Sequence, residues 1–278
     1  MFSYAAAIAI ATRSGAHLEL DKTSGFVYDK LYRRTYQLGA FKISANETSE
    51  NSRLEFIGGR GLRYLLRRIS RLTPLERRLL VEDQYNQCFE DRFVRLITTG
   101  TVWLEGLFQS DRYFIEVSNS VRNEFRFRPI CDHSVQMDQR RISAVQTPVA
   151  LGVRLYEEAN GRSVHSILGR DYYLNAAAYI AGRVANPHFF VFCSSRDWVE
   201  NVLRLPYKYS VIGPRLDNSD AHKDMFLMTK CSHYIIPNST FHWWGAWLSE
   251  NINKLVVAPV AAFPNRDSVP AEWVMMKR

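Results

Sequence analysis

The chain of 278 residues contains few cysteines, no long apolar run and no DxD motif. Its four cysteines lack the close spacings of a zinc site and the density of a disulfide framework, which predicts reduced, buried thiols in a cytoplasmic protein. No stretch approaches the roughly 20 consecutive apolar residues that a membrane-spanning helix requires. No DxD motif of the kind that holds a metal-bridged diphosphate is present, which is consistent with a protein that uses no metal ion and no cofactor.

The excess of basic over acidic residues indicates which classes of partner the protein could bind. Lysine and arginine number 36 against 28 aspartates and glutamates, which gives a formal net charge of +8. This balance suits nucleic acids, anionic membranes and phosphate-bearing ligands. No RRM, helix-turn-helix or zinc-finger pattern is present, which disfavours a nucleic-acid partner. The glycines within residues 58–61 lack the GxGxxG spacing and its strand–helix context, which disfavours a nicotinamide-dependent dehydrogenase.

The C-terminal half alternates short β-branched or aromatic runs with segments of helical period, a pattern typical of βαβ units and a parallel sheet. We therefore predict a Rossmann-like lobe over residues 148–278 and a separate lobe over residues 1–147, with a boundary in the polar stretch Arg141–Pro148. The expected strands are Val149–Leu155, His188–Cys193, Tyr209–Ile212, His233–Pro237 and Lys254–Ala258. The expected helices are Tyr172–Val184, Asp197–Arg204, Ala221–Cys231 and Phe241–Glu250, with Asp171, Asp220 and Thr240 as N-caps.

The N-terminal half is less regular. Composition predicts a buried, alanine-rich helix at Ala5–Ser14, a short strand at His17–Leu20 and a polar loop over residues 46–53. The segment Gly61–Leu72 places five leucines and isoleucines on one helical stripe, with arginines around it. This stripe suits either packing onto the N-terminal lobe or, over residues 61–78, contact with an anionic bilayer.

The turn Asn238-Ser239-Thr240 follows a predicted buried strand and opens a predicted helix. Unpaired N–H groups and the helix dipole converge at such a point, so it favours an anion site, to which the Ser239 and Thr240 hydroxyls would contribute. Simple N-capping by Thr240 is the alternative interpretation. Trp243 and Trp244 follow on the same helix, where they would line a sugar pocket or belong to the core.

The segment Met225–Pro259 is similar to the signature of bacterial α-1,2-fucosyltransferases, in which "LM..C.H.I..NS.FSWWGAWL" precedes a "K.V.AP" strand. Four further segments resemble the family in the same order along the chain. They are Met1–Ala11 (family GNQMFQYA), Leu104–Phe114 (GYFQS.KYF), Asp171–Ala177 (YY..A) and Phe189–Trp198 (F.FS.D..W).

The resemblance implies an α/β GT-B fold of two Rossmann-like lobes with the active site in the cleft between them. It implies transfer of L-fucose from GDP-fucose to a galactoside hydroxyl, with inversion and without a metal. The acceptor would be a glycan or a lipid-linked oligosaccharide, reached from the cytoplasmic face of the membrane. The implied donor-binding residues are Arg154, Ser194, Ser195, Asn238, Ser239, Thr240, Phe241, Trp243 and Trp244.

The chain departs from the family at its phosphate-binding motif. Residues 151–158 read LGVRLYEE where relatives read HVRRGDY, so Gly152 stands at the histidine position and Leu155 at the second arginine position. Arg154 retains the first arginine, and its place at the end of the first strand of a Rossmann lobe makes it the predicted diphosphate ligand and catalytic residue. Glu157 stands where relatives carry an aspartate, which makes it a candidate catalytic base or a solvated carboxylate.

Two further departures bear on activity. Ser194 and Ser195 replace two acidic residues of the family, which weakens the expected recognition of the guanosine. The family's glycine-rich GGLGNQ turn would precede Met1. We expect that its absence reflects a truncated reading frame rather than a protein that has lost catalytic activity. The alternative function is a catalytically degenerate relative that binds nucleotide or glycan without turnover.

Overall fold

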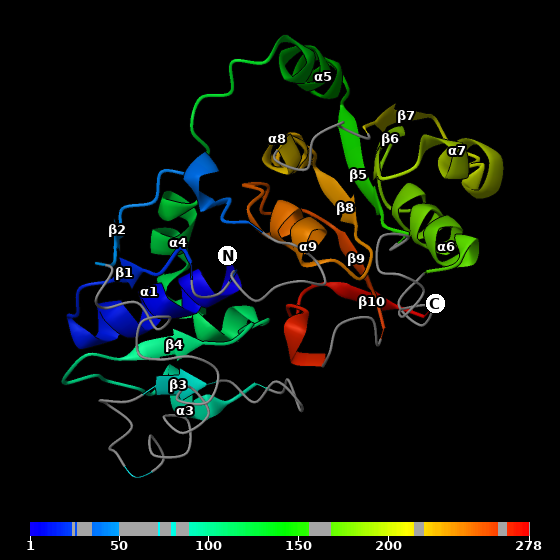
Figure 1. The fold of residues 1–278 in the computed structure, drawn as a ribbon. Coiled ribbons are helices and arrows are strands. Elements are labelled where there is room, and N and C mark those ends of the chain that lie inside the picture. The colour runs from blue at the N-terminus through cyan, green and yellow to red at the C-terminus, as the bar shows by residue number, and fades with distance from the viewer. Residues whose placement is uncertain are drawn as a thin grey trace. The chain divides into compact units, whose positions relative to one another are not determined.

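A computed structural model describes residues 1–23, 26, 35–49, 72, 79–81, 89–155, 168–213, 220–260 and 266–277. The chain divides into two compact units, Met1–Arg126 and Phe127–Arg278 (Figure 1). The first unit corresponds to most of the expected N-terminal lobe and the second contains the whole expected Rossmann-like lobe. The functional division into an acceptor lobe and a donor lobe stays a prediction.

The second unit is built on a six-stranded sheet in which every neighbouring pair is parallel. Its strand order is β10-β9-β8-β5-β6-β7, so the chain starts at the centre of the sheet, builds outward on one side and then crosses to the other. The order therefore reverses between β5 and β8. The strands are β5 (Thr147–Val153), β6 (Pro187–Cys193), β7 (Tyr209–Ile212), β8 (His233–Ile235), β9 (Val256–Pro259) and β10 (Val274–Met276).

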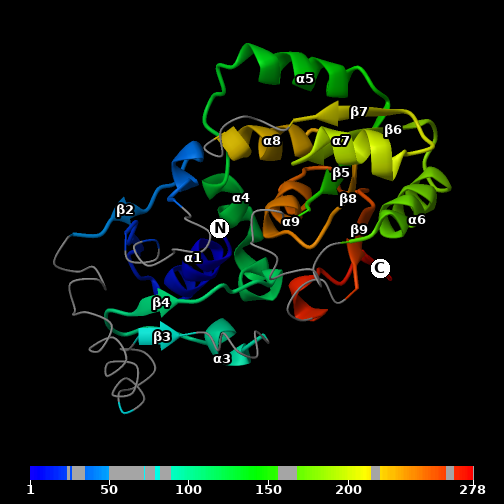
Figure 2. The ribbon, with the colours of Figure 1, turned by 45° about the vertical axis from the view of Figure 1, so that its right-hand side comes forward.

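Helices cover both faces of this sheet (Figures 1 and 2). Val149, Leu151 and Val153 of β5 belong to the apolar core that also contains the buried residues of α6. Because side chains alternate along a strand, Ala150 and Gly152 face the other side, where α9 packs. The helices are α5 (His133–Ser143), α6 (Arg170–Ala181), α7 (Arg196–Trp198) with a π-helical turn at Val199–Leu203, α8 (Ala221–Met228) and α9 (Thr240–Trp247).

Tyr172 links α6 to the carboxyl end of β8, beside the point where the strand order reverses. Its ring is fully buried, and its hydroxyl donates to the carbonyl oxygen of Ile236 at 2.7 Å. The same hydroxyl lies 3.3 Å from the carbonyl oxygen of Val257. These contacts fix the backbone just beyond β8, from which the turn into α9 begins.

The first unit centres on α1 (Phe2–Ser14), in which Ala5, Ala6 and Ala9 are buried, as expected for the predicted alanine-rich helix. Gly15 ends the helix in the left-handed conformation, and the helix terminus is closed by backbone bonds to the carbonyls of Ala11 and Thr12. The remaining described elements are β1 (Glu19–Leu20), β2 (Asn46–Glu47), β3 (Leu79–Val81), α3 (Asp91–Val94), β4 (Trp103–Glu105) and α4 (Ser118–Glu124), with 3-10 turns at Leu38–Ala40, Asp111–Tyr113 and Ile115–Val117.

All five strands expected in the C-terminal half are present, and none of their ends is shifted by more than two residues. The predicted polar loop was wrong at Asn46–Glu47, because these residues pair with β1 as a short parallel strand. Two N-caps were also misplaced: Ser239 rather than Thr240 precedes α9, and Gly169 rather than Asp171 precedes α6. Asp220 does occupy the cap position of α8.

We expect Tyr172→Phe to lower the free energy of unfolding by about 1–3 kcal/mol, because it leaves the buried Ile236 carbonyl without its hydroxyl donor. Chemical denaturation of the whole chain measures this change. Tyr179→Phe on the same helix is the matched control, since the ring face that it presents to Arg183 is retained. Equal stability of the Tyr172 variant and the native chain would contradict the proposed tie.

Candidate functional site

The predicted site residues gather at one edge of the six-stranded sheet. In a parallel sheet all carboxyl ends lie at the same edge, and ligands bind in the crevice where the strand order reverses. Here that point lies between β5 and β8, whose register pairs Leu151 with Ile235. Arg154 and Asn238 each lie three residues beyond this pair. The topology therefore brings the predicted diphosphate ligand and the predicted anion-binding turn to the same crevice.

Helix α9 begins directly after this turn. Ser239 is the N-cap residue by backbone conformation, but its side chain makes no capping hydrogen bond. The first intrahelical bond runs from the Trp243 amide to the Ser239 carbonyl at 3.0 Å. The Ser239 amide donates to the Pro237 carbonyl at 2.8 Å. The amides of Thr240, Phe241 and His242 have no intrahelical acceptor, because they belong to the first turn. Asn238, Ser239, Thr240 and Phe241 are all half-buried, so this end is accessible.

Arg154 lies half-buried just past β5, close to the imidazole of His242 on α9. The His242 side chain is 5% exposed. Burial, and after it the Arg154 charge, lower the pKa of His242 to about 3, although an interaction with the Phe192 backbone acts in the opposite direction. His242 is therefore neutral at physiological pH. His242 lies within the family signature Met225–Pro259, but the sequence pattern did not assign it to the site. Its position beside Arg154 follows only from the packing of α9 on β5.

Close packing of α9 on β5 requires Gly152. A Cβ atom built on Gly152 would lie 2.1 Å from Cδ2 and 2.7 Å from Nε2 of His242, far inside contact distance. No larger residue fits while the imidazole holds this place. Gly152 at the family's histidine position is thus explained by the ring that occupies the space above it.

Ser194 and Ser195 follow β6, the neighbour of β5 on the other side. The register pairs Val153 of β5 with Cys193 of β6. Arg154 and Ser194 are therefore the first residues beyond this pair on the two neighbouring strands. Ser194 is exposed, and the Ser195 hydroxyl accepts from the Trp198 amide at 3.3 Å to cap α7. Ser195 therefore has a structural role in addition to its predicted contact with the donor. Burial raises the pKa of the neighbouring Cys193 thiol to about 11, so that thiol stays protonated at neutral pH.

Trp243 and Trp244 belong to the core of the second unit. They are 0% and 2% exposed and contact each other at a ring-centroid distance of 5.0 Å. The Trp243 Nε1–H donates to the buried Ser268 carbonyl at 2.9 Å. These rings support the first turn of α9 from within, as the core interpretation predicted. A direct contact of either ring with a sugar stays a prediction.

Two predicted features lie outside the described residues. Glu157, the candidate base, falls in the segment between Leu155 and Leu168. Of residues 61–78, the predicted membrane-contact segment, only Leu72 is described. In the described part of the chain, no helix is long and apolar enough to cross a membrane.

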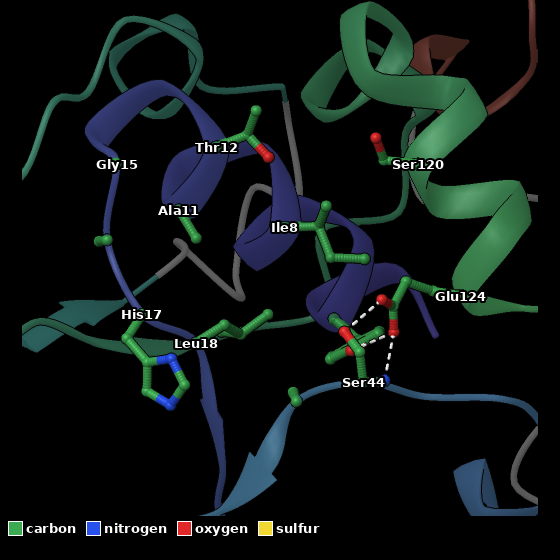
Figure 3. A pocket seen from close by; sticks show the side chains of 12 residues that line it. Ile8, Ala11, Thr12, Gly15, His17, Leu18, Ser44, Ser120 and Glu124 are labelled. Atoms are coloured by element: carbon green, nitrogen blue, oxygen red, sulfur yellow. Dashed lines mark hydrogen bonds between the residues drawn. The ribbon is translucent and has the colours of Figure 1, made fainter.

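A separate hollow of about 390 Å³ lies in the first unit between α1, α4 and the segment around Ser44 (Figure 3). None of the predicted donor-binding residues lines it. Glu124 stands at its wall, with its carboxylate accepting from the Tyr4 hydroxyl at 2.8 Å and from the Ser44 amide at 2.7 Å. The Ser44 hydroxyl also donates to this carboxylate. Because these donors satisfy the carboxylate, it acts as a structural link between α4 and the Ser44 segment.

The order and the parallel pairing of its strands define an α/β protein built on a parallel sheet. Residues 76–276, well over half of the chain, match glycosyl transferase family 11. The chain belongs to this family, as its resemblance to the α-1,2-fucosyltransferases predicted.

Two curated proteins from Escherichia coli are similar in sequence. Alpha-1,2-colitosyltransferase is 27% identical over 190 residues, which cover 64% of this chain and 64% of that protein. The O-antigen biosynthesis glycosyltransferase WbnK is 40% identical over 98 residues, which cover 34% of this chain and 31% of that protein. The chain thus spans less than two thirds of the length of each of these relatives.

Solved structures agree on the fold. A variant of Arabidopsis thaliana FUT1 in complex with GDP matches with a TM-score of 0.53 at 13% identity, over 92% of this chain and 66% of that one. The NodZ α-1,6-fucosyltransferase soaked with GDP-fucose matches with a TM-score of 0.50 at 17% identity, over 89% of this chain and 87% of that one. A second structure, of NodZ from Bradyrhizobium, also matches with a TM-score of 0.50. The expected α/β fold of GT-B type is confirmed.

We expect Gly152→Ala to lower the free energy of unfolding by about 1–3 kcal/mol, because the new methyl group forces the His242 ring out of its place. Thermal or chemical denaturation measures the loss. Gly39→Ala is the control, since the nearest atom to a Cβ there is a Tyr36 ring carbon at 4.0 Å. An alanine at position 152 that costs no more than the alanine at position 39 would show that the packing is looser than described.

Proposed function

We propose that the chain transfers L-fucose from GDP-fucose to a galactoside hydroxyl, forming an α-1,2 linkage with inversion and without a metal ion. The observation that carries the proposal is the convergence of Arg154 and the N-terminus of α9 at the reversal of strand order. Family membership supports the reaction class. The relatives with GDP or GDP-fucose named in their structures support the donor class.

In this proposal the protein stabilises the departing GDP by charge and by fixed hydrogen-bond donors. The Arg154 guanidinium offers a planar pair of N–H groups that matches a phosphate. The amides of the first turn of α9 add backbone donors, and the helix dipole adds a partial positive charge. Because these groups are held by the packed sheet and by Tyr172, they need little reorganisation when the sugar–phosphate bond breaks.

The other contacts are assigned by position. Ser194 and Ser195 are proposed for the nucleoside end, and Asn238, Ser239, Thr240 and Phe241 for the diphosphate and sugar end. Glu157 is proposed as the base that takes the proton of the acceptor hydroxyl. The acceptor is proposed to be a glycan or a lipid-linked oligosaccharide. Residues 61–78 are proposed to contact an anionic membrane. Sedimentation with anionic and with neutral vesicles distinguishes this contact from packing of the segment onto the N-terminal lobe.

We expect Arg154→Ala to weaken GDP binding by about 1.5–3 kcal/mol, the range for a hydrogen bond to a charged group. Isothermal titration with GDP measures the change. Arg183→Ala, just beyond the end of α6, removes the same charge from an exposed position, and it should leave GDP affinity nearly unchanged. Unchanged affinity in a folded Arg154 variant would overturn the assignment of this residue.

Colitosyl transfer is the second candidate, because a curated relative carries that activity in its name. Colitose is the 3-deoxy counterpart of fucose, so the two donors differ by one hydroxyl group. A site that hydrogen-bonds this hydroxyl discriminates strongly against a donor that lacks it. We expect kcat/KM to be at least about tenfold higher for GDP-fucose than for GDP-colitose.

The opposite ratio would move the function to colitosyl transfer. GDP binding without turnover of either donor would instead identify the chain as a degenerate, binding-only member of the family. UDP serves as the control ligand, since a site built for a guanine nucleotide should bind it much more weakly than GDP.

A further inference from the structure

A neutral, buried imidazole stands where the crevice meets the end of β5. The His242 ring comes from α9, yet it occupies the space directly above Gly152 of β5. Of the ring atoms, Cδ2, Nε2 and Cγ face this glycine, at 2.1, 2.7 and 2.8 Å from an ideal Cβ. The imidazole therefore fills the volume that a side chain at position 152 would otherwise take.

The hydrogen bonding of the ring leaves one nitrogen available. Phe192 is the residue paired with Gly152 in β6, and its backbone interacts with the ring. Because Nδ1 has no partner and Nε2 faces Gly152, we assign this interaction to Nε2. A bond of this kind that favours the charged ring has the imidazole as donor, which leaves the lone pair on Nδ1. Nδ1 is buried and has no hydrogen-bond partner among the residues that the structure describes. A buried acceptor without a donor is costly, and such groups call for an explanation.

Arg154 does not bond to Nδ1 in this structure, so the unsatisfied acceptor leaves a place for an N–H of the neighbouring cation. Arg154 lies close enough for its charge to act on the ring, and it follows Gly152 by two residues, so both lie on the α9 face of β5. A neutral imidazole accepts an N–H of a guanidinium without adding positive charge to the site. The chain also carries the reverse of the sequence pattern that it resembles: glycine instead of histidine at 152, and histidine instead of serine at 242.

We propose that His242 is a positioning residue of the donor site: when a nucleoside-diphosphate sugar binds, Nδ1 of His242 accepts an N–H of Arg154 and holds the guanidinium toward the diphosphate. Gly152 and His242 form one unit, in which α9 delivers the imidazole that β5 lacks. The inference rests on the proposed function, because it takes the diphosphate as the ligand of Arg154.

Isothermal titration with GDP tests the proposal on four chains: native, His242→Ser, Arg154→Ala and the double variant. His242→Ser should weaken GDP binding about tenfold, as expected for two groups that are directly coupled. In the Arg154→Ala background the same substitution should change the affinity less than about twofold, because the guanidinium that it positions is absent. A role in packing alone would weaken binding equally in both backgrounds.

Two further variants distinguish a loss of GDP binding from a loss of the folded structure. The melting temperature is measured for each. His242→Gln keeps an amide for the Phe192 backbone and lacks an acceptor at the place of Nδ1, so it should weaken GDP binding while the chain stays folded. The exchange Gly152→His/His242→Ser returns an imidazole to the same space and should recover native affinity within about threefold.

The outcomes separate the two proposals. A native chain that does not bind GDP contradicts the proposed function and removes the ligand on which the inference rests. A native chain that binds GDP, with additive effects of His242→Ser and Arg154→Ala, overturns the inference alone. Full native affinity of a folded His242→Gln variant does the same.

Discussion

The contact between α9 and β5 is the constraint on which the candidate site depends. Because position 152 is glycine, the His242 ring can approach the strand to a distance that a Cβ atom would forbid. This approach sets the first turn of α9 beside the end of β5, where Arg154 leaves the sheet. The residues beyond the reversal of strand order thus supply one guanidinium, one neutral imidazole and the amides of a helix terminus. Each of these groups suits a phosphate-bearing ligand.

The rest of the second unit holds these groups in place. Tyr172 anchors the backbone beyond β8 through its bond to the Ile236 carbonyl, and Trp243 anchors α9 through its bond to the Ser268 carbonyl. Both bonds are buried, so neither competes with water. A site whose donors are fixed before the ligand arrives stabilises developing charge without reorganisation, which is the main physical source of catalysis in group transfer.

The sequence predicted the sheet well because its strands are short apolar runs buried on both faces, each followed by a helix of clear period. It missed β10, which has three half-buried residues, and α5, whose polar sequence gives little sign of a core face. The start of α5 was readable in principle, since the Asp132 carboxylate caps the amides of Ser134 and Val135. The N-cap of α9 was misplaced by one residue because Ser239 and Thr240 are equally good caps by type.

The site was predictable only in part. Strand ends and a helix start identified Arg154 and the 238–240 turn, since topology alone brings these to one edge. The pairing of Gly152 with His242 was hidden, because it joins residues 90 positions apart through a steric fit that periodicity cannot reveal. Sequence patterns record which residue types are present, whereas this fit depends on how closely a helix approaches a strand.

A crystal structure of the chain with GDP tests the central claim most directly. The account predicts the diphosphate at the N-terminus of α9, with phosphate oxygens about 3 Å from the Arg154 guanidinium and from the amides of the first turn. His242 should lie against Gly152 and contact Arg154 in the same structure. A diphosphate bound away from this crevice, for instance in the hollow beside Glu124 of the first unit, would contradict the account.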